Sequence, residues 1–221
     1  MKKGGIMKKL LSLGMALVLA LSLMACGQSA AGTGQSASDS AGDTVSAAES
    51  ESDGAGEALG TSDSNVLVAY FSWSGNTQEM ASYIAQQTGA DLYEIVPETP
   101  YPEDYNECGD VALAERDNNE RPAIAGLPDS LDQYDTIIIG YPIWWHTAPM
   151  IIGTFLESYD LTGKDVYPFT QSASMNTEQF DNSIDFVRES AGSGQVHDGL
   201  FARPSDTETI DAYLSDNGLT L

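Results

Sequence analysis

One stretch of sequence decides the fold: Val66-Leu67-Val68-Ala69-Tyr70-Phe71-Ser72-Trp73-Ser74-Gly75-Asn76-Thr77. Its first half is an unbroken apolar run, which is typical of a β-strand buried on both faces. Its second half is small and polar apart from Trp73, and a helical pattern with Met80 and Ile84 on one face begins at Asn76. A strand that passes through a short polar loop into a helix is the first unit of a parallel α/β sheet.

The same alternation continues to the end of the chain. We expect further strands at residues 91–96, 136–140, 166–170 and 195–202, the first of them at a sheet edge. Further helices are expected near residues 103–117, 149–159, 177–190 and 207–217. Five strands that alternate with helices predict an α/β fold with a parallel sheet covered on both faces. Ligands of such sheets lie beyond the carboxyl ends of the strands, here in the loops after Phe71, Gly140 and Thr170.

The first of these loops can hold a phosphate. It lies between a strand and the start of a helix, where unpaired backbone N–H groups and the helix dipole favour an anion. The hydroxyls of Ser72, Ser74 and Thr77 add donors, and Gly75 lets the backbone approach a ligand closely. The loop itself contains no lysine or arginine. A simple helix start capped by Ser74 or Asn76 remains the alternative.

The second loop, residues 141–149, places Trp144 and Trp145 beside His146 and between two prolines. Aromatic rings at the carboxyl end of a strand indicate a platform for a flat ligand. We expect one tryptophan to pack in the core and the other to contact ligand, and His146 to form a hydrogen bond within the loop. The third loop, residues 170–175, is small and polar, so that it can offer N–H groups to the carbonyl oxygens of a heterocycle.

Together these loops resemble those of the flavodoxin-like family, in which a hydrophobic strand precedes S-x-S-G-N-T and a later segment reads G-Y-P-I-W-W. The resemblance covers Val66 to Leu219. It implies a flavodoxin-like three-layer sandwich with a five-stranded parallel sheet in the order 2-1-3-4-5, and FMN as cofactor. By this resemblance the phosphate is bound by Ser72, Ser74, Gly75, Asn76 and Thr77, and the isoalloxazine ring is lined by Pro142, Ile143, Trp144 and Trp145. His146, Thr170, Gln171 and Ser172 complete the predicted site. The third loop departs from the family pattern, because relatives usually have a glycine-rich turn where this chain has Gln171-Ser172-Ala173-Ser174.

The first 64 residues are expected to lie outside the folded domain of residues 65–221. Residues 1–25 combine four lysines with a short apolar run and small residues, as a secretory signal does. The ending Leu23-Met24-Ala25-Cys26 resembles the lipobox of bacterial lipoproteins, in which the cysteine is lipidated. Residues 26–64 then form an acidic Gly/Ser/Ala linker with too few apolar residues for a core. A plain signal peptide or an uncleaved anchor is the alternative.

Charge and residue counts exclude several kinds of partner. After removal of residues 1–25 the chain has five basic and 33 acidic side chains, a formal charge of −28, and such a surface repels nucleic acid. The two histidines, His146 and His197, are too few for a metal site. If Cys26 carries lipid, Cys108 is the remaining thiol, and we interpret it as an ordinary helix residue whose pKa is raised by Glu107 and Asp110.

We therefore expect an FMN-binding flavodoxin-like lipoprotein that transfers electrons outside the cytoplasm, anchored to a bacterial membrane through lipid on Cys26. Its redox partner would be another protein or a membrane electron donor, since nicotinamide cofactors are cytoplasmic. An FMN-dependent quinone reductase is one alternative. A flavin-free solute-binding or scaffolding lipoprotein is the other, and the altered third loop is its best support.

Overall fold

The computed structural model describes residues 64–221. The predicted signal sequence, Cys26 and nearly all of the predicted linker lie outside the described residues. Within residues 64–221 no helix combines the length and the apolar character that a membrane span requires.

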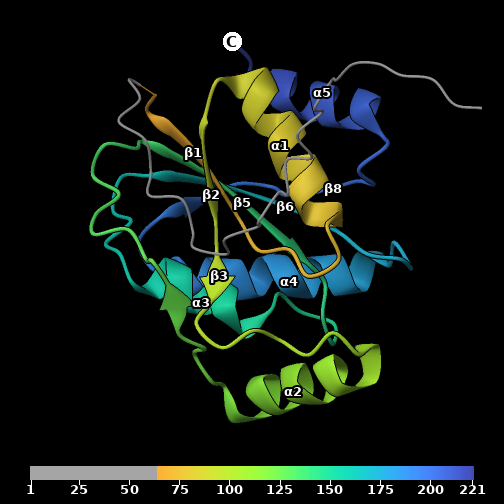
Figure 1. Ribbon diagram of the computed structural model, residues 1–221. Helices are drawn as coiled ribbons and strands as arrows, with labels where there is room; N and C mark the ends of the chain where they lie inside the picture. The colour runs from red at the N-terminus through yellow and green to blue at the C-terminus, as the bar shows by residue number, and fades with distance from the viewer. Residues whose placement is uncertain (1–63) are drawn as a thin grey trace, which may run out of the picture. The chain divides into compact units, whose positions relative to one another are not determined.

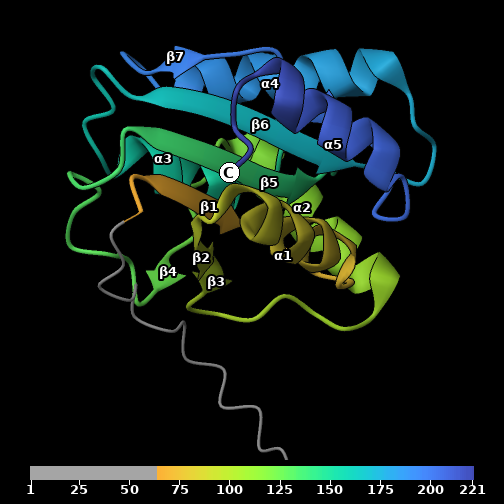
Figure 2. The same ribbon diagram turned by 90° about the horizontal axis from the view of Figure 1, so that it is seen from above.

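A parallel sheet forms the centre of the domain, in the order β2-β1-β5-β6-β7 with β8 also paired to β6. This confirms the predicted order 2-1-3-4-5 (Figure 2). The last position is filled by two short strands rather than by one strand over residues 195–202, because β7 pairs with the beginning of β6 and β8 with its end. The strands are β1 (Val66–Tyr70), β2 (Asp91–Glu94), β5 (Thr136–Pro142), β6 (Asp165–Gln171), β7 (Gln195–Val196) and β8 (Leu200–Phe201).

Helices cover both faces of this sheet (Figure 1). One face is covered by α1 (Asn76–Thr88) and α5 (Thr207–Asp216), and the other by α3 (Met150–Glu157) and α4 (Thr177–Ser190). Alternate residues of each strand point to opposite faces. Ile138 therefore packs in the cluster under α1 and α5, whereas Ile137 and Ile139 pack in the cluster under α3 and α4. The central strands contribute buried residues to both clusters, which explains their continuous apolar runs.

The segment between β2 and β5 adds a further layer. It contains α2 (Tyr105–Asn118), which lies outside the α3 and α4 layer (Figure 1), and a small antiparallel pair of β3 (Val96–Pro97) and β4 (Ile124–Ala125). Asp104 caps α2 by accepting hydrogen bonds from two backbone N–H groups of its first turn. The sequence predicted the helix but not the strand pair, whose strands are only two residues long.

Candidate functional site

The first loop leaves β1 and enters α1 in a compact conformation. The backbone N–H of Gly75 donates to Ser72 Oγ at 3.2 Å, and Asn76 Nδ2 donates to Ser74 Oγ at 3.2 Å. Gly75 has a φ of 87°, in the left-handed region that glycine tolerates best. A side chain at this position would meet no protein atom within 4 Å. The loop is thus held by its own polar groups and leaves open space over Gly75.

The start of α1 is not capped by any side chain. Asp104, Asn176 and Asp206 cap α2, α4 and α5, whereas α3, like α1, has no side-chain cap. The structure therefore does not support the alternative of a helix start capped by Ser74 or Asn76. The first N–H groups of an α-helix have no partner inside the helix, and together with the helix dipole they favour an anion.

A groove with a volume of about 540 Å³ lies over this loop at the carboxyl edge of the sheet. It brings together residues of all three predicted loops, with further residues from α1, α2 and the loop before α5. The predicted site residues that line it are Ser74, Asn76, Pro142, Ile143, Trp144, Gln171 and Ser172. The lining residues that were not among the predicted site residues are Trp73 and Ala173 of the predicted loops, and Glu79, Tyr105, Arg203, Pro204 and Ser205.

Other predicted site residues do not line this groove. Ser72 and Gly75 hold the first loop together, as described above, and Thr77 is buried. Thr170 is also fully buried, and its hydroxyl donates to the carbonyl oxygen of Tyr141, so its side chain supports the core of the sheet and does not face a ligand.

Trp145 and His146 line a second cavity of about 390 Å³ next to the groove. This cavity lies between α2 and the second loop. Its remaining lining includes Cys108, Gly109 and Gln179. The groove and the cavity share four lining residues, Trp73, Tyr105, Ile143 and Trp144.

The two adjacent tryptophans have different environments. Trp144 packs edge-on against Phe71 and Tyr101, with ring centroids 5.3 and 5.0 Å apart. Trp145 is 43% exposed, and its indole N–H donates to the carbonyl oxygen of Gly109 at 2.7 Å. Trp144 is thus the packed ring, and it is also the one that lines the groove, whereas Trp145 does not line it.

These tryptophans lie in a tight two-residue turn. Trp144 and Thr147 exchange backbone hydrogen bonds of 3.0 Å, and Trp145 and His146 between them have φ values of 46° and 69°. Positive φ at two adjacent bulky residues is uncommon, and such strain is concentrated at ligand sites. His146 Nδ1 lies 3.2 Å from Nε2 of Gln179 on α4, so its hydrogen-bond partner is outside the loop and not within it as expected.

The third loop is tightly turned despite its lack of glycine. Ser172 Oγ accepts the backbone N–H of Met175 at 3.1 Å and lies 3.2 Å from Ser174 Oγ. Met175 has a φ of 48°, so a side-chain residue takes a conformation that glycine often provides. Asn176 then caps α4. Local hydrogen bonds thus hold this turn without a glycine.

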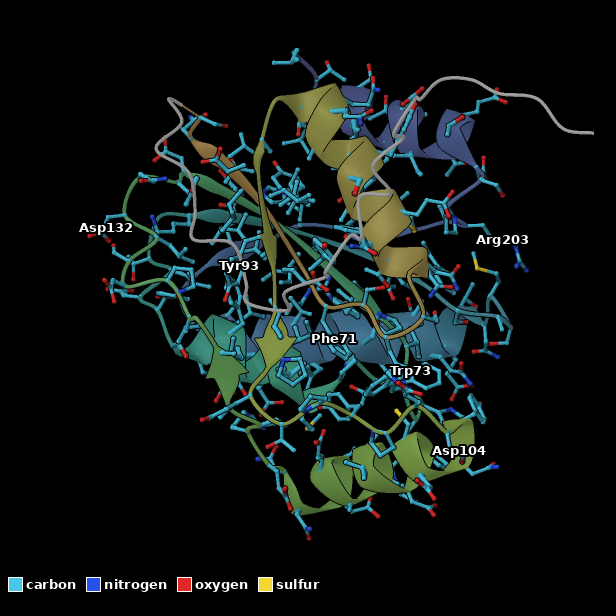
Figure 3. All side chains as sticks on the ribbon, viewed as in Figure 1. Phe71, Trp73, Tyr93, Asp104, Asp132 and Arg203 are labelled. Carbon is cyan, nitrogen blue, oxygen red and sulfur yellow. The ribbon has the colours of Figure 1, made fainter. Side chains whose placement is uncertain are left out.

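The segment that leads into α2 closes one side of the site. Trp73, labelled in Figure 3, donates its Nε1–H to the carbonyl oxygen of Pro102 at 3.0 Å, and its ring centroid lies 6.3 Å from that of Tyr105. Cys108 on α2 is 4% exposed. Burial is the main cause that raises the pKa of its thiol, followed by Glu115, so the predicted direction is right but Glu107 and Asp110 are not the cause.

Glu115 is the buried carboxylate of this layer, with 8% of its surface exposed. It accepts a hydrogen bond from the Tyr101 hydroxyl at 2.8 Å. Burial raises the pKa of Glu115, and the hydrogen bond from Tyr101 opposes this shift only in part. Among residues 64–221 no group of three or more His, Cys, Asp or Glu side chains is placed to hold a metal ion.

Comparison with solved structures finds the same architecture. A protein of Bacteroides eggerthii assigned as a flavoprotein is 35% identical, with a TM-score of 0.62, and the match covers 69% of this chain and 96% of that one. A similar protein of Bacteroides uniformis is 34% identical, with a TM-score of 0.62 and coverages of 68% and 97%. A Lactobacillus acidophilus flavoprotein solved in complex with FMN is 28% identical, with a TM-score of 0.54 and coverages of 65% and 96%.

No curated protein sequence is significantly similar to this chain. The family model described as Flavodoxin matches residues 65–213, which is most of the described part of the chain. The match includes the uncapped start of α1, the aromatic second loop and the third loop. The chain therefore belongs to the flavodoxin family.

Proposed function

We propose that this protein is a lipid-anchored flavoprotein that binds FMN and transfers electrons outside the cytoplasm. FMN as the cofactor is supported by the family match and by the FMN complex of the Lactobacillus acidophilus flavoprotein. When bound, FMN supplies the redox chemistry, and the protein supplies binding, orientation and electrostatics.

The observation that carries this proposal is the uncapped start of α1 opening into an aromatic-walled groove. The groove volume of about 540 Å³ lies within the range of small-molecule sites, roughly 300–1,000 Å³. The free helix end and the open space over Gly75 suit a terminal phosphate. Ile143 and Trp144 offer apolar surface to a flat ring system, and Gln171 and Ser172 offer polar groups. The residues present thus fit FMN.

The cellular location rests on the sequence alone. The lipobox-like ending at Cys26 would attach the protein to the outer side of a bacterial membrane, and the linker of residues 26–64 would tether the domain near the surface. The redox partner would then be a membrane electron donor or another protein, since nicotinamide cofactors are cytoplasmic. Growing bacteria that express the protein with a radioactive fatty acid tests the lipid anchor. The wild-type protein should be labelled, and the Cys26→Ser variant should not.

Purification of the protein tests whether FMN is its cofactor. We expect a yellow protein that releases one equivalent of FMN on denaturation, identified by its mass. A colourless protein that takes up no added FMN would contradict the proposal and favour a flavin-free solute-binding or scaffolding lipoprotein.

The second cavity favours one further candidate function, the reduction of a flat aromatic acceptor such as a quinone. It lies next to the groove, shares Trp73 and Trp144 with it, and has an accessible ring in Trp145. A bound acceptor there would lie close to a ring system in the groove. Anaerobic mixing of the reduced protein with a soluble quinone tests this function. Rapid reoxidation that slows in the Trp145→Ala variant would support it, and equal rates in both proteins would exclude this cavity as the acceptor site.

A further inference from the structure

Arg203 differs from the other basic residues of the domain. Residues 64–221 contain 26 acidic and only five basic side chains. Four of the basic side chains already have partners. Arg116, Arg121 and Arg188 form ion pairs with carboxylates, and Lys164 donates to two backbone carbonyls. In this part of the chain Arg203 is the basic residue whose side chain has neither a hydrogen bond nor an ion pair.

The fold places Arg203 at the same groove as the first loop. The residue follows β8, where the N–H of Ala202 donates to the carbonyl oxygen of Thr170 and fixes the chain at the carboxyl edge of the sheet. It precedes α5, which shares a face of the sheet with α1 (Figures 1 and 3). Arg203 and Ser205 line the groove together with Ser74 and Asn76.

The charges around the groove favour a cation beside a bound phosphate. The first loop has no basic residue, and Glu79, on the first turn of α1, lines the same groove. A phosphate monoester would therefore face a carboxylate in a strongly acidic domain. The guanidinium group of arginine offers several donors in a planar fork that matches a phosphate group, and charge-assisted hydrogen bonds of this kind are the strong ones.

We propose that Arg203 binds the phosphate group of FMN and supplies the positive charge that the first loop lacks. This inference rests on the proposed function, since it assumes that FMN occupies the groove. It places a ligand contact in the loop between β8 and α5. This loop is not one of the three that the sequence predicted to form the site. Its consequence is selectivity for FMN over riboflavin, which has the same ring system without the phosphate.

Titration of the flavin-free, full-length protein with FMN and with riboflavin tests the proposal, with flavin fluorescence as the readout. In the Arg203→Gln variant we expect FMN affinity to fall by about tenfold or more, since a hydrogen bond to a charged group is lost, and riboflavin affinity to stay within about twofold. Arg203→Lys keeps the charge and should retain part of the FMN affinity. Arg188→Gln is the matched control, because it removes the same charge from an exposed ion pair on α4 and should leave both affinities unchanged.

The salt dependence gives a second readout. Added salt screens exposed charges, so raising the ionic strength should reduce the ratio of the FMN affinity of the wild-type protein to that of Arg203→Gln. Equal FMN affinity in wild type and Arg203→Gln would overturn the inference, and so would an equal loss for FMN and riboflavin. A wild-type protein that binds no flavin would instead refute the proposed function itself, together with this inference.

Discussion

Gly75 is the residue on which the proposed phosphate site depends most directly. Its φ of 87° is strained for any residue with a side chain, and a Cβ would project into the open space over the loop. Replacing Gly75 with Ala should therefore lower the free energy of unfolding by about 1–2 kcal/mol. It should also reduce FMN affinity by about tenfold or more, because the phosphate could no longer approach the backbone N–H groups.

Gly163→Ala provides the control for this prediction. Gly163 has a similar φ of 78° and equally open surroundings, but it lies in the turn before β6 and not at the groove. Urea unfolding should show comparable losses for the two variants, whereas FMN titration should show a loss only for Gly75→Ala. Unchanged FMN affinity in Gly75→Ala would place the phosphate elsewhere.

Individual residues also show where sequence reasoning reached its limit. The roles of Ser74 and Trp144 at the groove could be predicted, because residue type and position after a buried strand point to them. Arg203 could not, because nothing in its local sequence shows that it lacks a partner while the other basic residues have one. The positive φ values of Trp145 and His146 were equally hidden, since a bulky residue such as Trp145 rarely adopts this conformation.

At the scale of elements, α2 carries a buried carboxylate, Glu115, which accepts a hydrogen bond from the Tyr101 hydroxyl. Glu115 is ionised at neutral pH in the unfolded chain, whereas its burial in the folded protein raises its pKa. A raised folded-state pKa gives stability that is present below the ordinary value near 4.5 and is lost as the pH rises through the folded value. The variant Glu115→Gln removes this charge and keeps an acceptor for Tyr101. As the pH rises from 4 to 7, we expect the wild type to lose stability relative to this variant.

Urea unfolding at both pH values measures this difference. Glu103→Gln is the control, because Glu103 is an exposed carboxylate just before α2, and this variant should follow the wild type at both pH values. A constant difference between Glu115→Gln and wild type from pH 4 to pH 7 would show that Glu115 titrates alike in the folded and unfolded states.

Most elements could be read from the sequence because their signals are local. The continuous apolar runs of β1 and β5 and the helical periodicity of α1 and α4 predicted those elements at nearly the observed positions. The broken last strand and the β3–β4 pair were missed for another reason. Each of these strands is two residues long and is defined by pairing with distant residues, for which the sequence contains no periodic signal.

At the scale of the whole molecule, the acidic charge should tune the redox chemistry. Residues 64–221 carry 26 acidic side chains against five basic ones. Negative surroundings disfavour an anionic reduced flavin, so the potential for forming the hydroquinone of bound FMN should lie below that of free FMN. Added salt should raise this potential, because it screens the exposed charges.

Spectroscopic redox titration at low and high ionic strength checks this prediction, with free FMN measured under the same conditions. A potential above that of free FMN would show that local contacts, among them Arg203, outweigh the net charge. A potential that does not change with salt would show that exposed charges have no part in setting it.

The central claim is that the first loop holds the phosphate of FMN. A crystal structure of the protein with FMN tests it most directly. We predict that phosphate oxygens lie within hydrogen-bonding distance of backbone N–H groups of residues 74–77, at the uncapped start of α1, and that the ring system lies against Ile143 and Trp144. A phosphate bound away from residues 72–77, or a groove that stays empty in the presence of excess FMN, would contradict this account.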